Sequence, residues 1–282
     1  MIEVYAFLAM FAVQILAMSF LLPARIIRYS REQSMNISAE RLAQVYPGVD
    51  HDLATKRFLT RLRAGSTGLA VIGLLALGWL SSYMRRPDWN LGPVIALNTV
   101  YYVLQYLPLL LAAWFTYRIY KTHENPASEG KRTAMLERRG LFDFVSPFTV
   151  FLAVLAYFLF VALAIFFQRE SFPGFFLVGT LTLVYAHQAF EIYRALYGKK
   201  RGPLDTHAVR AHRTGFGVKL SVYICIIVAV FFAFAFMIDL LDQKKWVPFA
   251  ESVLFVTITL LISTGLSAMI RKSAVRQSEV PS

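Results

Sequence analysis

The chain has 282 residues, of which 57% are hydrophobic and 16% are charged, and its formal net charge is +12. Soluble globular domains carry about 25% charged residues and about 45–50% apolar ones. This composition excludes a disordered chain, a collagen-like fibre and an ordinary soluble domain. The single cysteine, Cys225, excludes an intramolecular disulfide framework and a zinc cluster built from thiolates. We therefore expect an all-α, polytopic membrane protein.

Seven apolar stretches are long enough to cross a bilayer as helices. A helical span needs about 20 mostly apolar residues, because unpaired backbone groups in hydrocarbon cost several kcal/mol each. The stretches cover residues 4–22, 67–83, 93–117, 145–167, 175–193, 220–240 and 247–270. They predict a seven-helix bundle that forms one membrane domain over residues 1–282. Residues 24–66 form the longest loop, in which residues 35–46 can fold as a short interfacial helix.

The distribution of Lys and Arg predicts how the bundle is oriented. Of the 29 basic residues, all but Arg85, Arg86, Arg169, Lys244 and Lys245 fall in one set of alternate loops and in the C-terminal tail. We therefore expect an outside N-terminus and a cytoplasmic C-terminus, in the inner (plasma) membrane of a bacterium. The start of the first stretch, Met-Ile-Glu-Val-Tyr, is acidic rather than basic, and no small-residue cleavage site follows, so we expect an uncleaved anchor.

The cytoplasmic ends of the stretches resemble one another. Tyr117-Arg-Ile-Tyr120 is similar to Tyr193-Arg-Ala-Leu-Tyr197, and each precedes a basic–Gly step that opens the next stretch. Two explanations remain open. Tyr and Arg anchor any span at the inner interface, or the hairpins are duplicates in parallel orientation, related by an axis along the membrane normal.

Ionisable and polar residues in the fifth stretch form the first candidate site, because such residues at membrane depth are costly and commonly functional. This intramembrane site consists of Tyr185, His187, Gln188 and Glu191. His187 and Glu191 are four residues apart and share a helix face, so the carboxylate favours a protonated imidazole, which suits a proton relay or a pH gate. Alternatively, Glu191 pairs with a cytoplasmic arginine and His187 donates to a backbone carbonyl.

A second group of polar residues follows one side of the third stretch, toward a predicted proline kink at Pro108. Its members are Asn98, Tyr101, Tyr102 and Gln105. Such a stripe can line a wet cavity, since polar groups are tolerated in a membrane where they find partners or water. It can equally hold neighbouring helices together, with each hydrogen bond worth about 0.6 kcal/mol on average.

The basic cytoplasmic loops predict contact with lipid rather than with nucleic acid. Anionic headgroups attract about 1 kcal/mol per basic residue near the surface. The residues expected at the headgroups are Arg118, Arg194, Lys199, Lys200, Arg201 and Arg271. The expected partners are thus the bilayer with its anionic phospholipids, together with further copies of the chain or subunits of a membrane complex.

The sequence contains few motifs that are typical of catalysis or of cofactor binding. The chain has no phosphate-binding Gly-x-x-x-x-Gly-Lys loop and no His-Glu-x-x-His, and no metal site, cofactor or catalytic residue can be inferred from it. Arg210-Ala-His-Arg-Thr-Gly215 resembles the Arg-Ala-His-x-Asn-x-x-Glu motif of the membrane-associated eicosanoid and glutathione proteins, with Thr214 in place of Asn and Gly217 in place of Glu. The resemblance covers three matching residues, and we do not assign the chain to that family.

Two classes of function therefore remain. We expect a non-catalytic multi-pass membrane protein that passes or senses a small solute, or that serves as a membrane subunit of a larger assembly, because no nucleophile–base set or metal-ligand set can be assembled from adjacent positions. The alternative, which the local resemblance implies, is a membrane-embedded enzyme that acts on a lipid or a glutathione-like substrate at the cytoplasmic leaflet.

Overall fold

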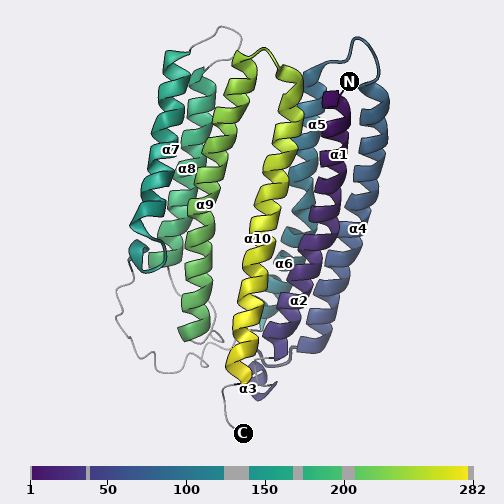
Figure 1. The fold of residues 1–282 in the computed structure, drawn as a ribbon. Helices are drawn as coiled ribbons and strands as arrows, with labels where there is room; N and C mark the ends of the chain where they lie inside the picture. Colours follow the sequence, from purple (N-terminus) through teal and green to yellow (C-terminus); the bar gives the residue numbers. More distant parts are fainter. Residues whose placement is uncertain (1, 36–38, 124–139, 168–173, 199–206, 279–282) are drawn as a thin grey trace. The chain divides into compact units, whose positions relative to one another are not determined.

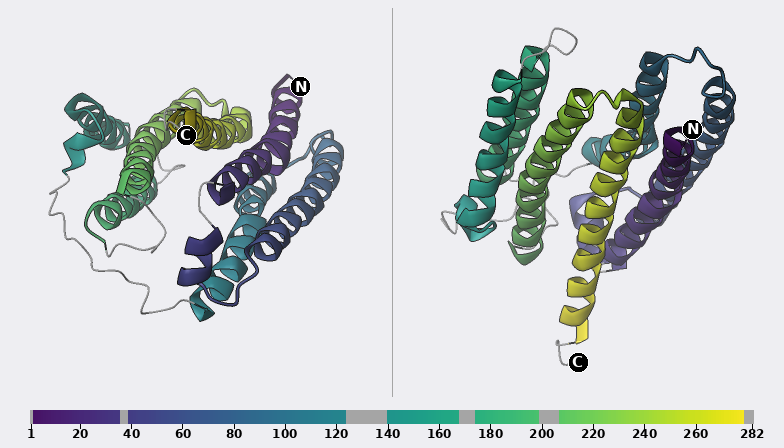
Figure 2. Two further views of the ribbon diagram at one scale, coloured as in Figure 1. Left: turned by 90° about the horizontal axis from the view of Figure 1, so that it is seen from below. Right: turned by 45° about the horizontal axis from the view of Figure 1, so that its top comes forward.

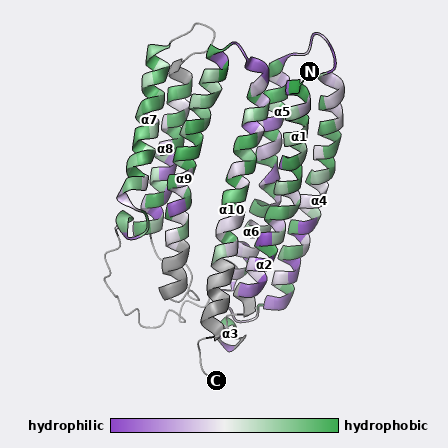
Figure 3. Ribbon diagram, viewed as in Figure 1, coloured by the Kyte–Doolittle hydropathy of each residue, from purple (hydrophilic) through white to green (hydrophobic). Residues whose placement is uncertain are grey.

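The computed structural model describes residues 2–35, 39–123, 140–167, 174–198 and 207–278 (Figure 1). Within these residues the regular structure is helical and no strand occurs, which confirms the predicted all-α class. Among them, six helices are long and apolar enough to cross a membrane, which indicates a multi-pass membrane protein. They are Ile2–Glu32, His51–Tyr83, Leu91–Thr122, Pro147–Phe166, Thr214–Leu240 and Lys244–Ala268. Figure 3 shows hydrophobic residues along most of α7 (Pro147–Phe166).

The fifth expected stretch forms helix α8, Gly174–Tyr197, but this helix is not among the six. Its 24 residues would extend over about 36 Å at 1.5 Å per residue, so length is not what sets it apart. Three strongly polar residues, His187, Gln188 and Glu191, lower its hydropathy instead. The count of seven spans therefore stays a prediction.

The chain divides into two compact units. Unit 1 contains α7, α8, α9 (His207–Leu240), the N-terminal residues through Phe7 and α10 (Val247–Ser278) as far as Ile258. Helices α7 and α8 both pack on α9, around a core that includes Phe160, Leu181 and Phe236. The short 3₁₀ turns η3 (Leu141–Asp143) and η4 (Lys244–Trp246) precede α7 and α10.

Unit 2 contains the rest of α1 (Ile2–Leu16), the helices through α6 and α10 from Thr259 onward. Its elements are η1 (Ala17–Leu21), α2 (Leu22–Met35), α3 (Ala39–Val45), α4 (His51–Tyr83), α5 (Leu91–Gln105) and α6 (Leu107–Thr122). Helix α4 packs against η1, α2, α5 and α6, and Figure 2 shows it beside the α1–α2 helix from two further directions. Helix α3 lies within residues 35–46, where the sequence predicts a short helix.

Two of the predicted spans in unit 2 are not regular α-helices. The first passes through the π-helical turn η1, in which the N–H of Leu22 bonds to the carbonyl of Ala17. The third is interrupted at Tyr106, between α5 and α6, two residues before Pro108. Proline has no N–H and its ring clashes with the preceding turn, so the break lies where the sequence predicts a kink.

Candidate functional site

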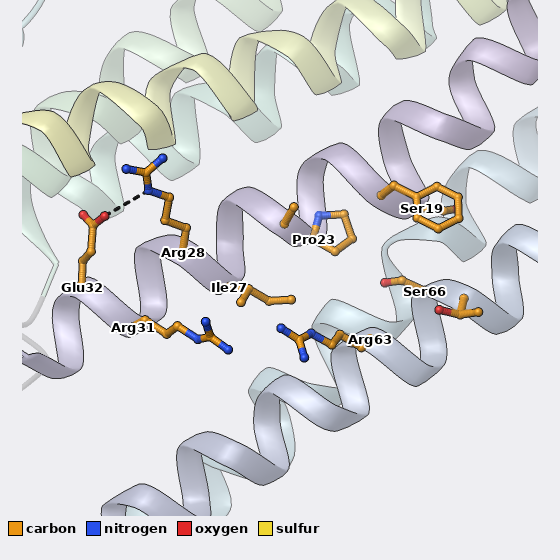
Figure 4. Close-up of a pocket in the computed structure, with 11 residues that line it drawn as sticks. Ser19, Pro23, Ile27, Arg28, Arg31, Glu32, Arg63 and Ser66 are labelled. Carbon is orange, nitrogen blue, oxygen red and sulfur yellow. Dashed lines mark hydrogen bonds and ion pairs between the residues drawn. The ribbon is translucent and has the colours of Figure 1, made fainter.

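A cavity of about 620 Å³ lies in unit 2 between α4 and the consecutive segments η1 and α2 (Figure 4). We call it the arginine pocket, because three of its residues are arginines. It is lined by Ser19, Phe20, Pro23, Ala24, Ile27, Arg28, Arg31, Glu32, Arg63, Ser66 and Thr67. Two stretches of chain about thirty residues apart thus build the whole site.

The π-helical turn explains why one face of the first helix can form half of the pocket. Residues spaced by four, Ser19, Pro23 and Ile27, are all buried, and all three line the cavity. Pro23 cannot donate a backbone hydrogen bond, and this favours an irregular turn before it. Such single π-turns inside α-helices occur frequently at functional sites.

The charges of the pocket are unbalanced. Glu32, which among the described lining residues is the sole acid, accepts a hydrogen bond from Arg28 Nε at 3.2 Å. Arg31 and Arg63 extend from α2 and α4 toward one another (Figure 4). Two guanidinium groups that converge repel each other unless an anion lies between them. Their fork of N–H donors matches carboxylate and phosphate oxygens.

The other end of the pocket is apolar. Its apolar wall consists of Ile27, which is buried, and of Phe20 and Ala24, which are exposed; the nearby Ser19 and Ser66 are 5% and 6% exposed. The pocket therefore combines a cationic mouth with an apolar wall, which is the complement of an anionic amphiphile. A free anion without an apolar chain would contact only the arginines at the mouth of the pocket.

Most of the predicted polar stripe lies inside unit 2. Asn98, Tyr101 and Gln105 are all on the buried face of α5. The Tyr101 hydroxyl donates to the carbonyl of Leu69 at 2.9 Å, which ties α5 to α4. Tyr102 is half-buried, and its hydroxyl shares a hydrogen bond of 2.7 Å with that of Tyr106.

The candidate residues of α8 take separate positions in unit 1. The Tyr185 hydroxyl lies 2.8 Å from the carbonyl oxygen of Ala153 and 3.1 Å from that of Cys225, so it joins α8 to both neighbouring helices. Glu191 forms an ion pair with Arg194 at 3.3 Å. Gln188 is half-buried, and the His187 side chain is exposed. The relay between His187 and Glu191 stays a hypothesis.

The residues predicted at lipid headgroups are only partly described. Arg118 is exposed, and its guanidinium lies 4.6 Å from the centre of the Trp114 ring, which suits the membrane interface. Arg194 is the partner of Glu191, and Arg271 lies in α10. Lys199, Lys200 and Arg201 lie outside the described residues.

Sequence reasoning did not single out the arginine pocket. Arg28 and Arg31 follow Pro23 at helical spacing, which is a signal within one helix. The approach of Arg63 depends on how α4 packs on α2, and no pattern in the sequence reveals that contact. Within the described part of the chain, no group of three or more His, Cys, Asp or Glu residues could hold a metal ion.

Comparison with protein-family models, with curated proteins and with solved structures gives no match. The likeness at residues 210–215 is a local resemblance of three matching residues.

Proposed function

We propose that the protein is a seven-span membrane protein that binds an anionic amphiphile of the cytoplasmic leaflet in the arginine pocket. The observation that carries this proposal is the convergence of Arg31 and Arg63 at one end of a cavity whose other end has an apolar wall. The seventh span is α8, whose length suffices to cross a bilayer.

The position of the pocket along its helices supports an amphiphilic ligand. Phe20 lies in the apolar part of the first span, and Arg31 lies near that span's end at Glu32. The acidic group of a lipid would lie between Arg31 and Arg63, and its chain would follow Phe20 and Ile27. Because the positive-inside pattern assigns these arginines to the cytoplasmic side, the ligand would enter from that leaflet.

The chemistry of the lining supports binding rather than catalysis. Among the described residues of the pocket there is no histidine, cysteine or aspartate, and Glu32 is already paired with Arg28. General acid–base catalysis needs a group that can exchange a proton with the substrate, and arginine does not titrate in the relevant range. A bound anion fits the expected role of a protein that senses or passes a small solute.

The test uses the full chain in lipid nanodiscs that contain either phosphatidylglycerol or phosphatidylcholine. We expect Arg31→Gln combined with Arg63→Gln to weaken retention of phosphatidylglycerol at least tenfold, since each charge-assisted hydrogen bond contributes about 1.5–3 kcal/mol. Arg57→Gln is the matched control, because Arg57 is exposed on α4 and is not part of the pocket. Native mass spectrometry counts the retained lipids.

Two further arms separate other sources of anion binding. Inorganic phosphate that displaces phosphatidylglycerol at millimolar concentration would show that the mouth alone suffices and that the ligand is a free anion. Substitution of Lys199, Lys200 and Arg201 by Gln should reduce the loosely bound acidic lipid only. Equal retention by the pocket variant and by Arg57→Gln would overturn the proposal.

A further inference from the structure

Unit 2 has a second set of polar side chains, which the arginine pocket does not explain. Gln14 of α1 is fully buried, and neither its amide nitrogen nor its amide oxygen has a hydrogen-bond partner. The same holds for both amide atoms of Gln105, a residue only 7% exposed, and for the hydroxyl of Ser19. These five polar atoms are shielded from bulk solvent within the described residues.

Two of these side chains, those of Ser19 and Gln105, lie beside the hydroxyl of Tyr101. Ser19 and Gln105 both interact with this hydroxyl, but its single proton goes to the carbonyl of Leu69 at 2.9 Å. The hydroxyl oxygen can still accept, but the polar side-chain atoms of Ser19 and Gln105 lie beside it without forming a hydrogen bond. Helices α4 and α5 and the turn η1 meet here.

Gln14 faces the same region. Phe11, Gln14 and Met18 are spaced by three and four residues and are all buried, so they share one face of the first helix. The Phe11 ring lies 5.3 Å from the ring of Tyr101, centre to centre, which directs this face toward α5. Gln14 follows Phe11 by one turn, on the side toward Ser19.

Buried polar atoms in folded proteins are satisfied by protein groups or by ordered water. A site that is polar and has several donors and acceptors within reach is where internal water is found, each molecule making about three hydrogen bonds. Gln14, Ser19, Tyr101 and Gln105 together offer both donors and acceptors. In hydrocarbon the alternative of leaving them unpaired is strongly unfavourable.

Ser19 connects this polar cluster with the arginine pocket, because it also lines the cavity between α2 and α4. We infer that the arginine pocket continues past Ser19 into a water-filled chamber lined by Gln14, Tyr101 and Gln105. All of these side chains are neutral, whereas the arginines are confined to the mouth. The chamber thus admits water and uncharged hydrogen-bonding groups, and an anion stays between Arg31 and Arg63.

Cysteine labelling tests the chamber directly, because Cys225 is the one cysteine of the sequence and can be replaced by alanine. In that background, Ser19→Cys and Gln105→Cys should react with a small uncharged methanethiosulfonate reagent at least tenfold faster than two control variants. The first control is Val103→Cys, because Val103 is exposed on the same helix as Gln105. The second is Val94→Cys, because Val94 is a fully buried apolar residue of that helix. A lipid-facing or dry thiol ionises poorly and reacts slowly.

The labelling rates at positions 19 and 105 show whether water reaches the polar cluster. Slow labelling at both Ser19→Cys and Gln105→Cys would show that no water reaches the cluster. Fast labelling at Ser19→Cys alone would show that the pocket ends there, which also overturns the chamber. Substitution of Arg31 and Arg63 by Gln should leave the labelling of Gln105→Cys unchanged, so this inference can hold or fail independently of anion binding.

Radiolytic footprinting of the unmodified chain avoids any loss of folding that a substitution causes. Hydroxyl radicals form from bound water, so Tyr101 should be oxidised, whereas Phe160 in the dry core of unit 1 should not. Equal protection of the two residues would contradict a water-filled chamber.

Discussion

Gly73 is the residue that lets Tyr101 lie against α4. A Cβ atom at this position would overlap the Tyr101 hydroxyl and would lie 2.9 Å from Ile15 Cγ1. The glycine thus permits the hydrogen bond from Tyr101 to Leu69 that holds the polar cluster in place. Its role is close approach of side chains, because no positive φ angle requires glycine here.

We therefore expect Gly73→Ala to destabilise the protein by about 1–3 kcal/mol, the usual cost of overpacking a core. Gly78→Ala is the matched control on the same helix, since a Cβ there meets no atom within 4 Å. Alanine at position 78 should leave the protein equally stable or stabilise it by up to about 1 kcal/mol. Thermal unfolding in detergent measures both variants.

Addition of Tyr101→Phe should restore part of the stability that Gly73→Ala loses, because it removes the hydroxyl with which the new methyl group collides. If Gly73→Ala and Gly78→Ala unfold at the same temperature, the close contact between α4 and Tyr101 is wrong.

The spacing of polar residues in the sequence predicts which positions of α5 share one face. Asn98, Tyr101 and Gln105 recur at intervals of three and four residues, which is the spacing of one helix face. Arg31 and Arg63 could not be paired in the same way. They are thirty-two residues apart in the sequence, and each alone has the appearance of an interfacial arginine.

The π-helical turn η1 sets the direction in which α2 presents its arginines. One extra residue in a helical turn rotates everything that follows by about 100° relative to a regular α-helix. Pro23 lies two residues after the end of this turn at Leu21, and the carbonyl of Ser19, four residues before Pro23, cannot receive an N–H from it.

Pro23→Ala should remove the reason for the irregular turn and let the helix continue as a regular α-helix. Arg28 and Arg31 would then turn away from α4, so we expect phosphatidylglycerol retention to fall to the level of the double arginine variant. Stability should not fall, because an interior proline costs a helix about 3 kcal/mol. Native mass spectrometry and thermal unfolding give the two readings.

The control for this change is Pro93→Ala, since Pro93 is exposed in the first turn of α5, where proline is well tolerated. Retention that is lost in both proline variants, or in neither, would show that η1 does not orient the pocket.

Hydrophobic length and proline positions predicted most of the elements. The six long apolar helices coincide with six of the expected stretches, and the break at Tyr106 lies next to Pro108. The π-turn was not predicted, because residues 17–21 read as an ordinary apolar helix and a register shift of one residue leaves no trace in composition.

Helix α8 decides the membrane topology of the protein. An odd number of spans places the two termini on opposite sides of the membrane, and an even number places them on the same side. Six helices satisfy the requirements of length and hydropathy, and α8 satisfies that of length. The distribution of basic residues favours the odd number. Loops rich in Lys and Arg alternate with loops poor in them along the whole sequence only if α8 crosses the membrane.

Fusions to a reporter that is active only outside the cytoplasm test this arrangement around α8. A reporter placed after Phe167, at the end of α7, should be active, and one placed after Gly198, beyond α8, should be silent. A fusion after Ser282 should also be silent, because we expect the C-terminus in the cytoplasm. A cytoplasmic reporter at the same three positions should give the reverse pattern. Equal activity after Phe167 and Gly198 would show that α8 does not cross the membrane, and an active fusion after Ser282 would reverse the predicted side of the C-terminus.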